Sequence, residues 1–160
     1  MAKSNSYVVD GIDDSNDFEE MQDAGRRLGF SKTQQTFMFD TVAGILHLGA
    51  LTFKAKRVGN ADGCEIKRNK QLKMAAKFLH ITEENLRKCV THRSIVVGGR
   101  KTYIPLNPQQ AVDACDALAK SIYSRMFDWI VERVNDATKA KSSLKKRNQK
   151  FIGVLDIFGF

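Results

Sequence analysis

Apolar residues at helical spacing dominate the first part of the chain. One such pattern runs through about residues 16–27, where Ser15 or Asn16 can cap a helix. Gly29 can end it, because glycine readily adopts the left-handed conformation found at helix C-termini. The chain is therefore predicted to open with one short helix.

A second, longer helix is predicted to follow at once. Ser31 and Gln34 have the spacing of a capping box, in which each side chain bonds the backbone N–H of the other residue. The helix ends near Gly49, and residues 51–53 have the pattern of a short strand. The apolar stripe of this helix consists of Phe39, Val42, Ala43 and Leu46.

Two shorter helices, over about residues 71–79 and 82–90, precede a predicted β-hairpin. Residues 94–97 and 100–104 flank the pair Gly98-Gly99. A two-residue hairpin turn requires positive φ angles, which glycine tolerates.

The longest helix is predicted to run from Pro108 to about residue 135. Asn107 provides a cap, and proline suits the first helical position because its missing N–H has no bond to make there. The helix needs packing partners along one side, since it carries a continuous stripe of Ala111, Cys115, Leu118, Ile122, Met126, Trp129 and Ile130.

The last ten residues have a different pattern. Residues 151–155 are a continuous apolar run, typical of a strand buried on both faces of a parallel sheet. No other segment predicts strands that could build such a sheet around it. We therefore expect a mostly α (α+β) chain that is one piece of a larger fold.

Composition and charge narrow the functional classes. The 160 residues are 42% hydrophobic and 28% charged, which is typical of globular proteins. No apolar run approaches the ~18 residues of a membrane span. The three cysteines form no C-x-x-C pair, which suits a reducing, cytoplasmic setting. The net charge of +8 favours an acidic or polyanionic partner.

These charges are unevenly distributed. Residues 10–23 are acidic but lack the alternating spacing of an EF-hand calcium loop. Residues 54–77 are basic, and residues 139–150 contain bases and no acid. The basic stretches raise an alternative function, a helical module that binds nucleic acid or has a purely structural interaction role. Against nucleic acid, residues 139–150 offer no aromatic side chain on which a base could stack.

Candidate chemistry lies just beyond the predicted C-terminal strand. Asp156 and Gly159 follow it, at the edge of the sheet where open α/β proteins bind ligands. A carboxylate there can hold a magnesium ion or its waters, and a glycine lets a backbone N–H approach a phosphate closely.

Three segments of the chain together resemble one known protein family. V-L-D-I-F-G-F, which ends the chain, is similar to the family's switch II segment. D-A-L-A-K from Asp116, continued by I-Y-S-R-M-F-D-W-I-V, resembles the long helix that precedes switch II. V-A-G-I-L-H-L-G from Val42 resembles a helix of the upper 50-kDa subdomain. The resemblance spans residues 7–160, and on it the chain is identified as a fragment of a myosin heavy chain motor domain that ends in switch II.

The resemblance implies ATP and Mg²⁺ as ligands of the complete motor, a P-loop NTPase. Asp156 would bond to a water on the magnesium ion, and Gly159 would donate its backbone N–H to the γ-phosphate. The sequence contains neither the G-x-x-x-x-G-K-[ST] phosphate loop nor switch I, so no catalytic set is complete in it. We expect no cofactor for this chain alone, and neither appreciable ATP binding nor hydrolysis.

The resemblance also implies a contact with actin. Residues 90–110 resemble the loop that reaches from the upper 50-kDa subdomain to the filament. Arg93, Arg100 and Lys101 would be attracted to the acidic surface of actin. Many myosins carry an acidic or phosphorylatable residue sixteen positions before D-A-L-A-K, which here is Arg100. A shift of two residues gives that position to Thr102, and both assignments remain open.

The implied organisation has three parts. Residues 7–138 form the helical upper 50-kDa region, residues 139–150 a basic linker, and residues 151–160 a strand of the motor's central sheet with the start of switch II. The implied partners are the actin filament and the rest of the motor domain. Light chains would bind only through other regions, and neither a membrane span nor nucleic acid is expected. The implied location is the cytoplasmic actin cytoskeleton, as part of a myosin complex.

Overall fold

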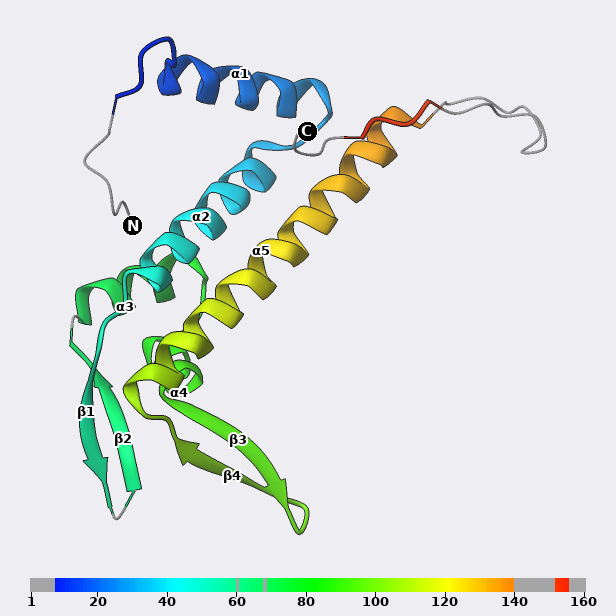
Figure 1. The fold of residues 1–160 in the computed structure, drawn as a ribbon. Coiled ribbons are helices and arrows are strands. Elements are labelled where there is room, and N and C mark those ends of the chain that lie inside the picture. Colours follow the sequence, from blue (N-terminus) through cyan, green and yellow to red (C-terminus); the bar gives the residue numbers. More distant parts are fainter. Residues whose placement is uncertain (1–7, 60, 68, 140–151, 156–160) are drawn as a thin grey trace.

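The computed structural model describes residues 8–59, 61–67, 69–139 and 152–155. The two longest helices, α2 and α5, run side by side, with both hairpins gathered at one end and α1 at the other (Figure 1). The prediction of a mostly α chain is confirmed. The elements are α1 (Asp14–Arg27), α2 (Lys32–Gly49), β1 (Phe53–Val58), β2 (Ala61–Ile66), α3 (Asn69–Phe78), α4 (Glu83–Thr91), β3 (His92–Val97), β4 (Arg100–Pro105) and α5 (Pro108–Thr138).

Both predicted starts of the long helices are confirmed. At α2, the Ser31 hydroxyl accepts from the backbone N–H of Gln34, and the Gln34 side chain accepts from the backbone N–H of Ser31. Asn107 and Gln110 form the same reciprocal pair at α5, with Pro108 at the first helical position. These bonds satisfy N–H groups that have no partner within the helix.

The first helix begins earlier than predicted. Its cap is Asp13 rather than Ser15 or Asn16, because the Asp13 carboxylate accepts from the backbone N–H groups of those two residues, both at 3.1 Å. The predicted end is confirmed, since Gly29 has φ +80°. The helix contacts α2 and buries none of its own residues.

The buried face of α2 is not the predicted one. Its buried positions are Gln35, Thr41, Gly44 and Leu48 rather than Phe39, Val42, Ala43 and Leu46. The helix packs against α3 on the side of Gly44, where a Cβ atom would lie 2.7 Å from the Leu79 side chain. Phe39 instead packs on Phe18 of α1, with ring centroids 4.8 Å apart. Gly44 therefore marks the closest contact, and the predicted apolar stripe is left half-buried or exposed.

The first hairpin, β1–β2, was only half predicted. A short strand over residues 51–53 was expected, whereas the strand starts at Phe53 and pairs with a second strand ending at Ile66. The missed signal is the dipeptide Gly59-Asn60, a two-residue turn sequence, and Gly59 has φ +60°. Phe53 and Ile66 are buried, which joins this hairpin to the core.

The second hairpin, β3–β4, forms as predicted. Gly98 and Gly99 have φ +56° and +77°, the angles that a two-residue turn requires. The strands pair from His92 opposite Pro105 to Val97 opposite Arg100. The hairpin projects away from the helices (Figure 1).

The hydrophobic core lies where the hairpins meet the helices. Of the stripe predicted for α5, Ala111 and Cys115 are buried, whereas the positions from Leu118 to Ile130 are half-buried. The core therefore thins toward the C-terminal end of α5. Its members are Leu48, Leu51, Phe53, Cys64, Ile66, Leu72, Ala75, Ala76, Leu86, Val90, Leu106, Ala111 and Cys115.

The predicted C-terminal strand is not formed by residues 152–155 in the chain by itself. They belong to no helix or strand, and the side chains of Ile152, Val154 and Leu155 are mostly exposed. The prediction was of a strand completed by segments from elsewhere, because a lone strand leaves its backbone groups unpaired, and so it stays a prediction.

Candidate functional site

The residues singled out from the sequence fall into two groups. Asp156 and Gly159 lie outside the residues that the structure describes. The other group is described and lies together on the β3–β4 hairpin: Arg93, Arg100, Lys101 and Thr102.

The hairpin is anchored at its base in the core. Strand β3 follows α4 without a break, and the N–H of Leu106 donates to the carbonyl of Thr91 at 2.9 Å. The Thr91 hydroxyl donates to the carbonyl of Arg87 at 2.7 Å. Val90, Thr91 and Leu106 are buried. The hairpin is thus a firmly rooted projection rather than a free loop.

The four predicted residues do not share one face. Directly opposite residues of an antiparallel pair have their side chains on the same face, and successive residues alternate. Arg93, Thr102 and Arg100 therefore lie on one face, which we call the arginine face; its other members are Ile95, Val97 and Ile104. Lys101 lies on the opposite face, which we call the tyrosine face; its other members are His92, Ser94, Val96, Tyr103 and Pro105.

The tyrosine face is held by α4. The Nζ atom of Lys88 lies 3.6 Å from the centroid of the Tyr103 ring, and Lys101 Nζ lies 5.6 Å from it. An ammonium group over an aromatic face is attracted by the ring quadrupole. The sequence did not indicate this contact, because Lys88 and Tyr103 lie on different elements and only the tertiary packing of α4 beside β4 brings them together.

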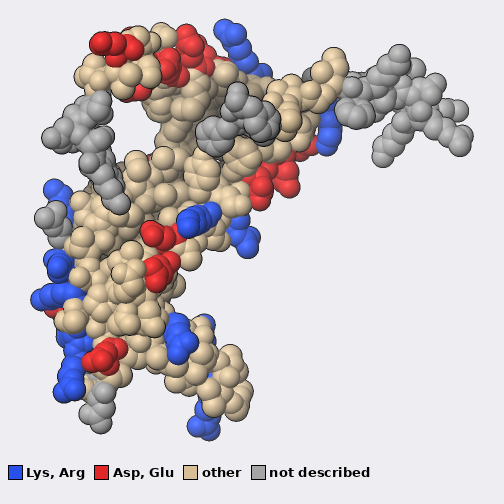
Figure 2. Space-filling model, viewed as in Figure 1, with Lys and Arg blue, Asp and Glu red and all other residues tan. Residues whose placement is uncertain are grey.

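The outer part of the hairpin combines positive charge with exposed apolar surface. Residues 92–105 contain no acidic side chain. Within the described part of the chain, Arg93, Arg100 and Lys101 form no salt bridge. Val96 and Val97 are 72% and 60% exposed. Figure 2 shows blue at the end of the hairpin and no red along it. Such a surface suits binding to an acidic partner.

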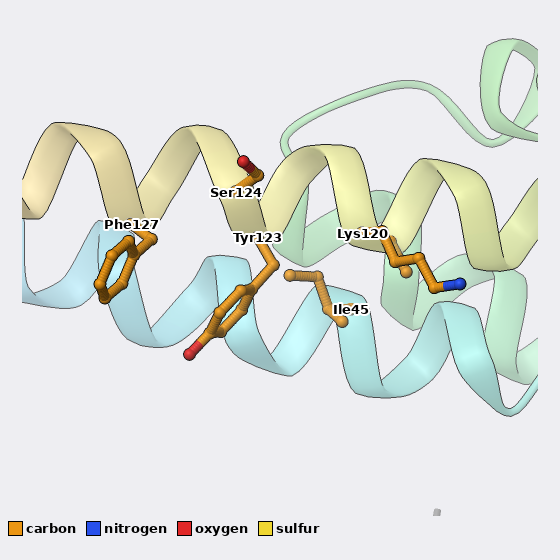
Figure 3. A pocket seen from close by; sticks show the side chains of 6 residues that line it. Ile45, Lys120, Tyr123, Ser124 and Phe127 are labelled. Carbon is orange, nitrogen blue, oxygen red and sulfur yellow. The ribbon is translucent and has the colours of Figure 1, made fainter. Parts of the chain in front are cut away.

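A hollow lies away from the hairpin, between α2 and α5. It has a volume of about 490 Å³ and is lined by Ile45, Ala119, Lys120, Tyr123, Ser124 and Phe127. In Figure 3 the rings of Tyr123 and Phe127 extend from α5 toward α2, beside Ile45. The lining is apolar apart from one ammonium and two hydroxyl groups, and it brings no acid, base and nucleophile together.

A second groove of about 450 Å³ runs among α2, α3, α4 and α5. It is lined mainly by apolar side chains, with Cys89 and Arg125 among its few polar groups. In neither hollow do the lining residues include a carboxylate. These two hollows therefore offer apolar contact surface and no set of catalytic side chains.

Two of the three cysteines are buried, and the third is exposed. Burial raises the pKa of the Cys115 thiol to about 12, and the nearby Asp116 carboxylate adds to that rise. Burial also raises the pKa of Cys64, whereas Cys89 is exposed. The prediction that Cys115 packs as a small hydrophobic side chain is confirmed. A thiolate nucleophile would need a lowered pKa, so neither buried thiol is suited to that role.

Neither a metal site nor a membrane-spanning helix is found in the described ranges. No three His, Cys, Asp or Glu side chains gather there as ligands for a metal ion. His47, on α2, instead bonds Gln71 Oε1 through Nδ1 at 2.6 Å and stacks on Phe78. None of the described helices has both the length and the apolarity to cross a bilayer.

Comparison with known proteins gives one family. The family model described as "Myosin head (motor domain)" matches residues 1–160. The chain is 37% identical over 160 residues to unconventional myosin-Vb of Rattus norvegicus, covering 99% of the chain and 8% of that protein. It is 40% identical over 164 residues to myosin heavy chain IB of Acanthamoeba castellanii, covering 99% of the chain and 13% of that protein. It is 35% identical over 162 residues to unconventional myosin-Ic of Mus musculus, covering 100% of the chain and 15% of that protein. The chain thus spans less than a sixth of the length of these relatives.

Proposed function

Because the chain belongs to the myosin motor domain family, we propose that it is part of an actin-based, ATP-driven motor and supplies part of the surface that contacts actin. In this proposal residues 7–138 are the helical upper 50-kDa region of the motor. The rest of the motor domain is the second partner, and the actin cytoskeleton is the location. Light chains would bind through other regions.

The β3–β4 hairpin is the observation that supports the actin contact best. It projects from the helices, is anchored in the core at its base, and carries Arg93, Arg100 and Lys101 with no acidic residue among them. Positive charge on an exposed projection attracts an acidic filament, and exposed valines at its end add apolar contact area.

Co-sedimentation of the 160-residue chain with actin filaments tests this contact. Reversing two charges on the hairpin, Arg93→Glu with Lys101→Glu, should raise the dissociation constant by about tenfold, because two exposed attractive charges become repulsive toward an acidic surface. The contribution should shrink as salt is raised, because exposed charges are screened.

A matched control changes the net charge equally elsewhere. Lys70 and Lys73 are exposed on α3, so Lys70→Glu with Lys73→Glu alters the total charge by the same amount away from the hairpin. It should leave actin binding within about twofold of the parent, since distant exposed charges are screened. Equal weakening by both double variants would mean that net charge, and not the hairpin, governs binding. A gel shift with random-sequence DNA that depends on Lys70 and Lys73 would instead favour the nucleic-acid alternative.

The second half of the proposal concerns the nucleotide of the complete motor. Asp156 would bond to a magnesium-bound water there, and Gly159 would donate its backbone N–H to the γ-phosphate; both lie outside the described residues. The support is the match of the family model through residue 160 together with the D-x-x-G spacing. ATP and Mg²⁺ are thus ligands of the complete motor.

For the isolated chain we propose neither appreciable ATP binding nor hydrolysis. The sequence has no glycine-rich lysine loop to hold the phosphates, which normally supplies much of the binding energy. Titration of the chain with Mg-ATP, followed by the fluorescence of its single tryptophan, Trp129, should show no saturable change. Saturation at micromolar ATP would contradict this part of the proposal.

A further inference from the structure

Helix α3 presents a row of lysines on its outer side. Lys70, Lys73 and Lys77 are exposed and follow the spacing i, i+3 and i+7, which places them in one stripe about 10 Å long. Lys67, exposed just before the helix, adds a fourth base. We call these four residues the lysine face. Residues 66–82 contain no acidic residue, and within the described part of the chain none of the four lysines forms a salt bridge.

The bases of the neighbouring β1–β2 hairpin are arranged differently, because they face acids. Lys54 and Lys56 both pair with Glu65, and Arg57 lies opposite Asp62 in the strand register. Figure 2 shows Lys and Arg side chains along the edge of the molecule where α3 and β1 lie. The surplus of positive charge on this edge therefore comes mainly from α3.

The apolar side of α3 is already used in the core. Leu72, Ala75 and Ala76 are buried, and the helix packs against α2. Helices that insert into a bilayer surface use an apolar face that is free to leave water. A contact made through α3 is thus limited to its charged side chains.

Among polyanions, an anionic bilayer fits the lysine face better than a nucleic acid does. Lysine is a point charge on a flexible stem, whereas the planar fork of arginine suits a single phosphate in fixed geometry. The bases of single strands stack on aromatic rings, but Phe78, the one aromatic residue of α3, is stacked on His47 with ring centroids 5.7 Å apart. Clusters of about four to eight bases on a helix are typical of binding to anionic lipid head groups.

We propose that the lysine face docks the chain on the surface of a bilayer that contains anionic phospholipids, by electrostatic attraction and without insertion. This goes beyond the proposed function and does not depend on the actin contact, which concerns the other hairpin. Each base near an anionic surface contributes about fivefold in affinity, so four bases support weak, reversible binding.

Flotation of the 160-residue chain with lipid vesicles tests the docking. Vesicles of phosphatidylcholine with about 30% phosphatidylserine should carry the chain upward in a density gradient at about 0.1 M salt, and vesicles of phosphatidylcholine alone should not. Lys70→Gln with Lys73→Gln should lower the partition coefficient about tenfold, because two attractive charges are lost. Lys70→Arg with Lys73→Arg should bind as the parent does, since it keeps both charges.

A matched control removes two charges from the other basic stretch. Lys145→Gln with Lys146→Gln, within residues 139–150, changes the net charge by the same amount. If the chain docks through α3, charges elsewhere act only through screened, long-range attraction, so this control should lower binding less than twofold. A loss as large as that of Lys70→Gln with Lys73→Gln, or larger, would overturn the assignment to α3.

Three other outcomes would contradict the proposal. Binding that persists at about 0.5 M salt, or that is equal on neutral vesicles, would show contact through exposed apolar side chains instead. Parent-like binding of the Lys70→Gln and Lys73→Gln variant would exclude the lysine face. Fluorescence anisotropy with random-sequence duplex DNA at the same salt gives the third, since tighter binding to DNA than to vesicles, lost in that variant, would assign the face to nucleic acid.

Circular-dichroism melting of each variant serves as the control for folding. Lys70 and Lys73 are exposed, so their substitution should leave the melting temperature close to that of the parent. A loss of vesicle binding at an unchanged melting temperature then reports on the surface and not on the fold.

Discussion

Gly44 shows how a single missing side chain sets the distance between two helices. An added Cβ would lie 2.7 Å from both Cγ and Cδ2 of Leu79, which is closer than carbon atoms approach in folded proteins. Leu79 directly follows α3, so the close packing of α2 against this end of α3 needs a position 44 without a side chain. The polar neighbours on the same face are satisfied locally, since the hydroxyl of Thr41 donates to the carbonyl of Phe37 at 2.7 Å.

Gly44→Ala should therefore destabilise the chain relative to Gly49→Ala. Both changes replace a helical glycine of α2, but nothing lies within 4 Å of a Cβ at position 49. Overpacking typically costs about 1–3 kcal/mol. The free energy of unfolding of Gly44→Ala should therefore be lower than that of Gly49→Ala by roughly that amount. Urea titration followed by circular dichroism measures it. Equal stability would show that Leu79 moves aside without cost.

The three cysteines should differ sharply in reactivity. Cys89 is exposed, whereas burial raises the pKa of Cys64 and raises that of Cys115 to about 12. The thiolate is the reactive form, so in native buffer near neutral pH one thiol per chain should react rapidly with a chromogenic disulfide, and Cys89→Ser should abolish that phase. Rapid modification of two or three thiols would contradict the packing of Cys64 against the core.

The same thiols make stability fall at alkaline pH. The folded chain holds the Cys115 proton up to about pH 12, while in the unfolded chain the thiol loses it near its ordinary pKa of 9.0. The stabilisation that comes from keeping the Cys115 thiol protonated is therefore fully present below about pH 9. It is lost progressively as the pH rises toward 12. Cys115→Ala should flatten this part of the pH profile in thermal melts, at the cost of a small cavity.

At the scale of elements, short sequence signals correctly predicted features that depend only on neighbouring residues, namely helix starts and a hairpin turn. The capping boxes at Ser31 and Asn107 and the turn at Gly98-Gly99 involve residues within a few positions of one another, and all three form. The strand β2 was missed because its sequence, A-D-G-C-E-I, lacks the strict alternation of apolar and polar residues and has few of the β-branched and aromatic residues typical of strands.

Features that depend on packing could not be predicted in the same way. The buried positions of α2 include the polar residues Gln35 and Thr41, so the buried face is not the most apolar one and depends instead on where α3 and α5 pack. The contact between Lys88 and Tyr103 likewise depends on how β4 packs beside α4, because the two residues lie on different elements. Of the candidate site, the basic residues were predicted and their division between two faces was not.

The β1–β2 hairpin is stabilised from one side by a carboxylate between two lysines. Oε1 of Glu65 lies 2.6 Å from Nζ of Lys54, and Oε2 lies 2.9 Å from Nζ of Lys56. The hydrogen bonds from these two ammonium groups lower the Glu65 pKa to about 2. A lowered pKa means that the stabilisation is present above the ordinary value of 4.5 and is lost as the pH falls toward 2.

Glu65→Gln should remove this acid-dependent contribution. The parent should lose hairpin order between about pH 4.5 and pH 2 faster than the variant does, because the variant has no carboxylate to protonate there. Amide exchange or NMR shifts of residues 54–56 and 63–65 report on it. Identical acid profiles would show that Glu65 contributes nothing measurable, as is common for exposed ion pairs.

At the scale of the molecule, the opposite ends differ in charge. Acidic side chains concentrate on α1, and bases concentrate around the two hairpins and α3 (Figure 2). Between these ends, large apolar side chains remain exposed along α2 and α5, including Leu46, Tyr123 and Phe127. Exposed apolar surface of this kind favours association with other protein surfaces.

The chain alone should therefore self-associate as its concentration rises. Tyr123 and Phe127 are 53% and 54% exposed, so Tyr123→Ser with Phe127→Ser should reduce association measured by sedimentation velocity. Exposed substitutions typically change stability by no more than about 0.5 kcal/mol each, so the melting temperature should hold nearly constant. Unchanged association would place the self-associating surface elsewhere on the molecule.

Helix α5 has a mechanical consequence for the whole chain. Its 31 residues contain no glycine, and its one proline is at the first position, so it is an unbroken rod of about 46 Å at 1.5 Å per residue. The hairpin is rooted at the start of α5, and α2, which is shorter, packs along part of its length. A rotation of one degree at the hairpin end becomes a displacement of about 0.8 Å at the far end. A small tilt at the root of the projecting strands would thus become a larger sideways movement at the opposite tip of α5.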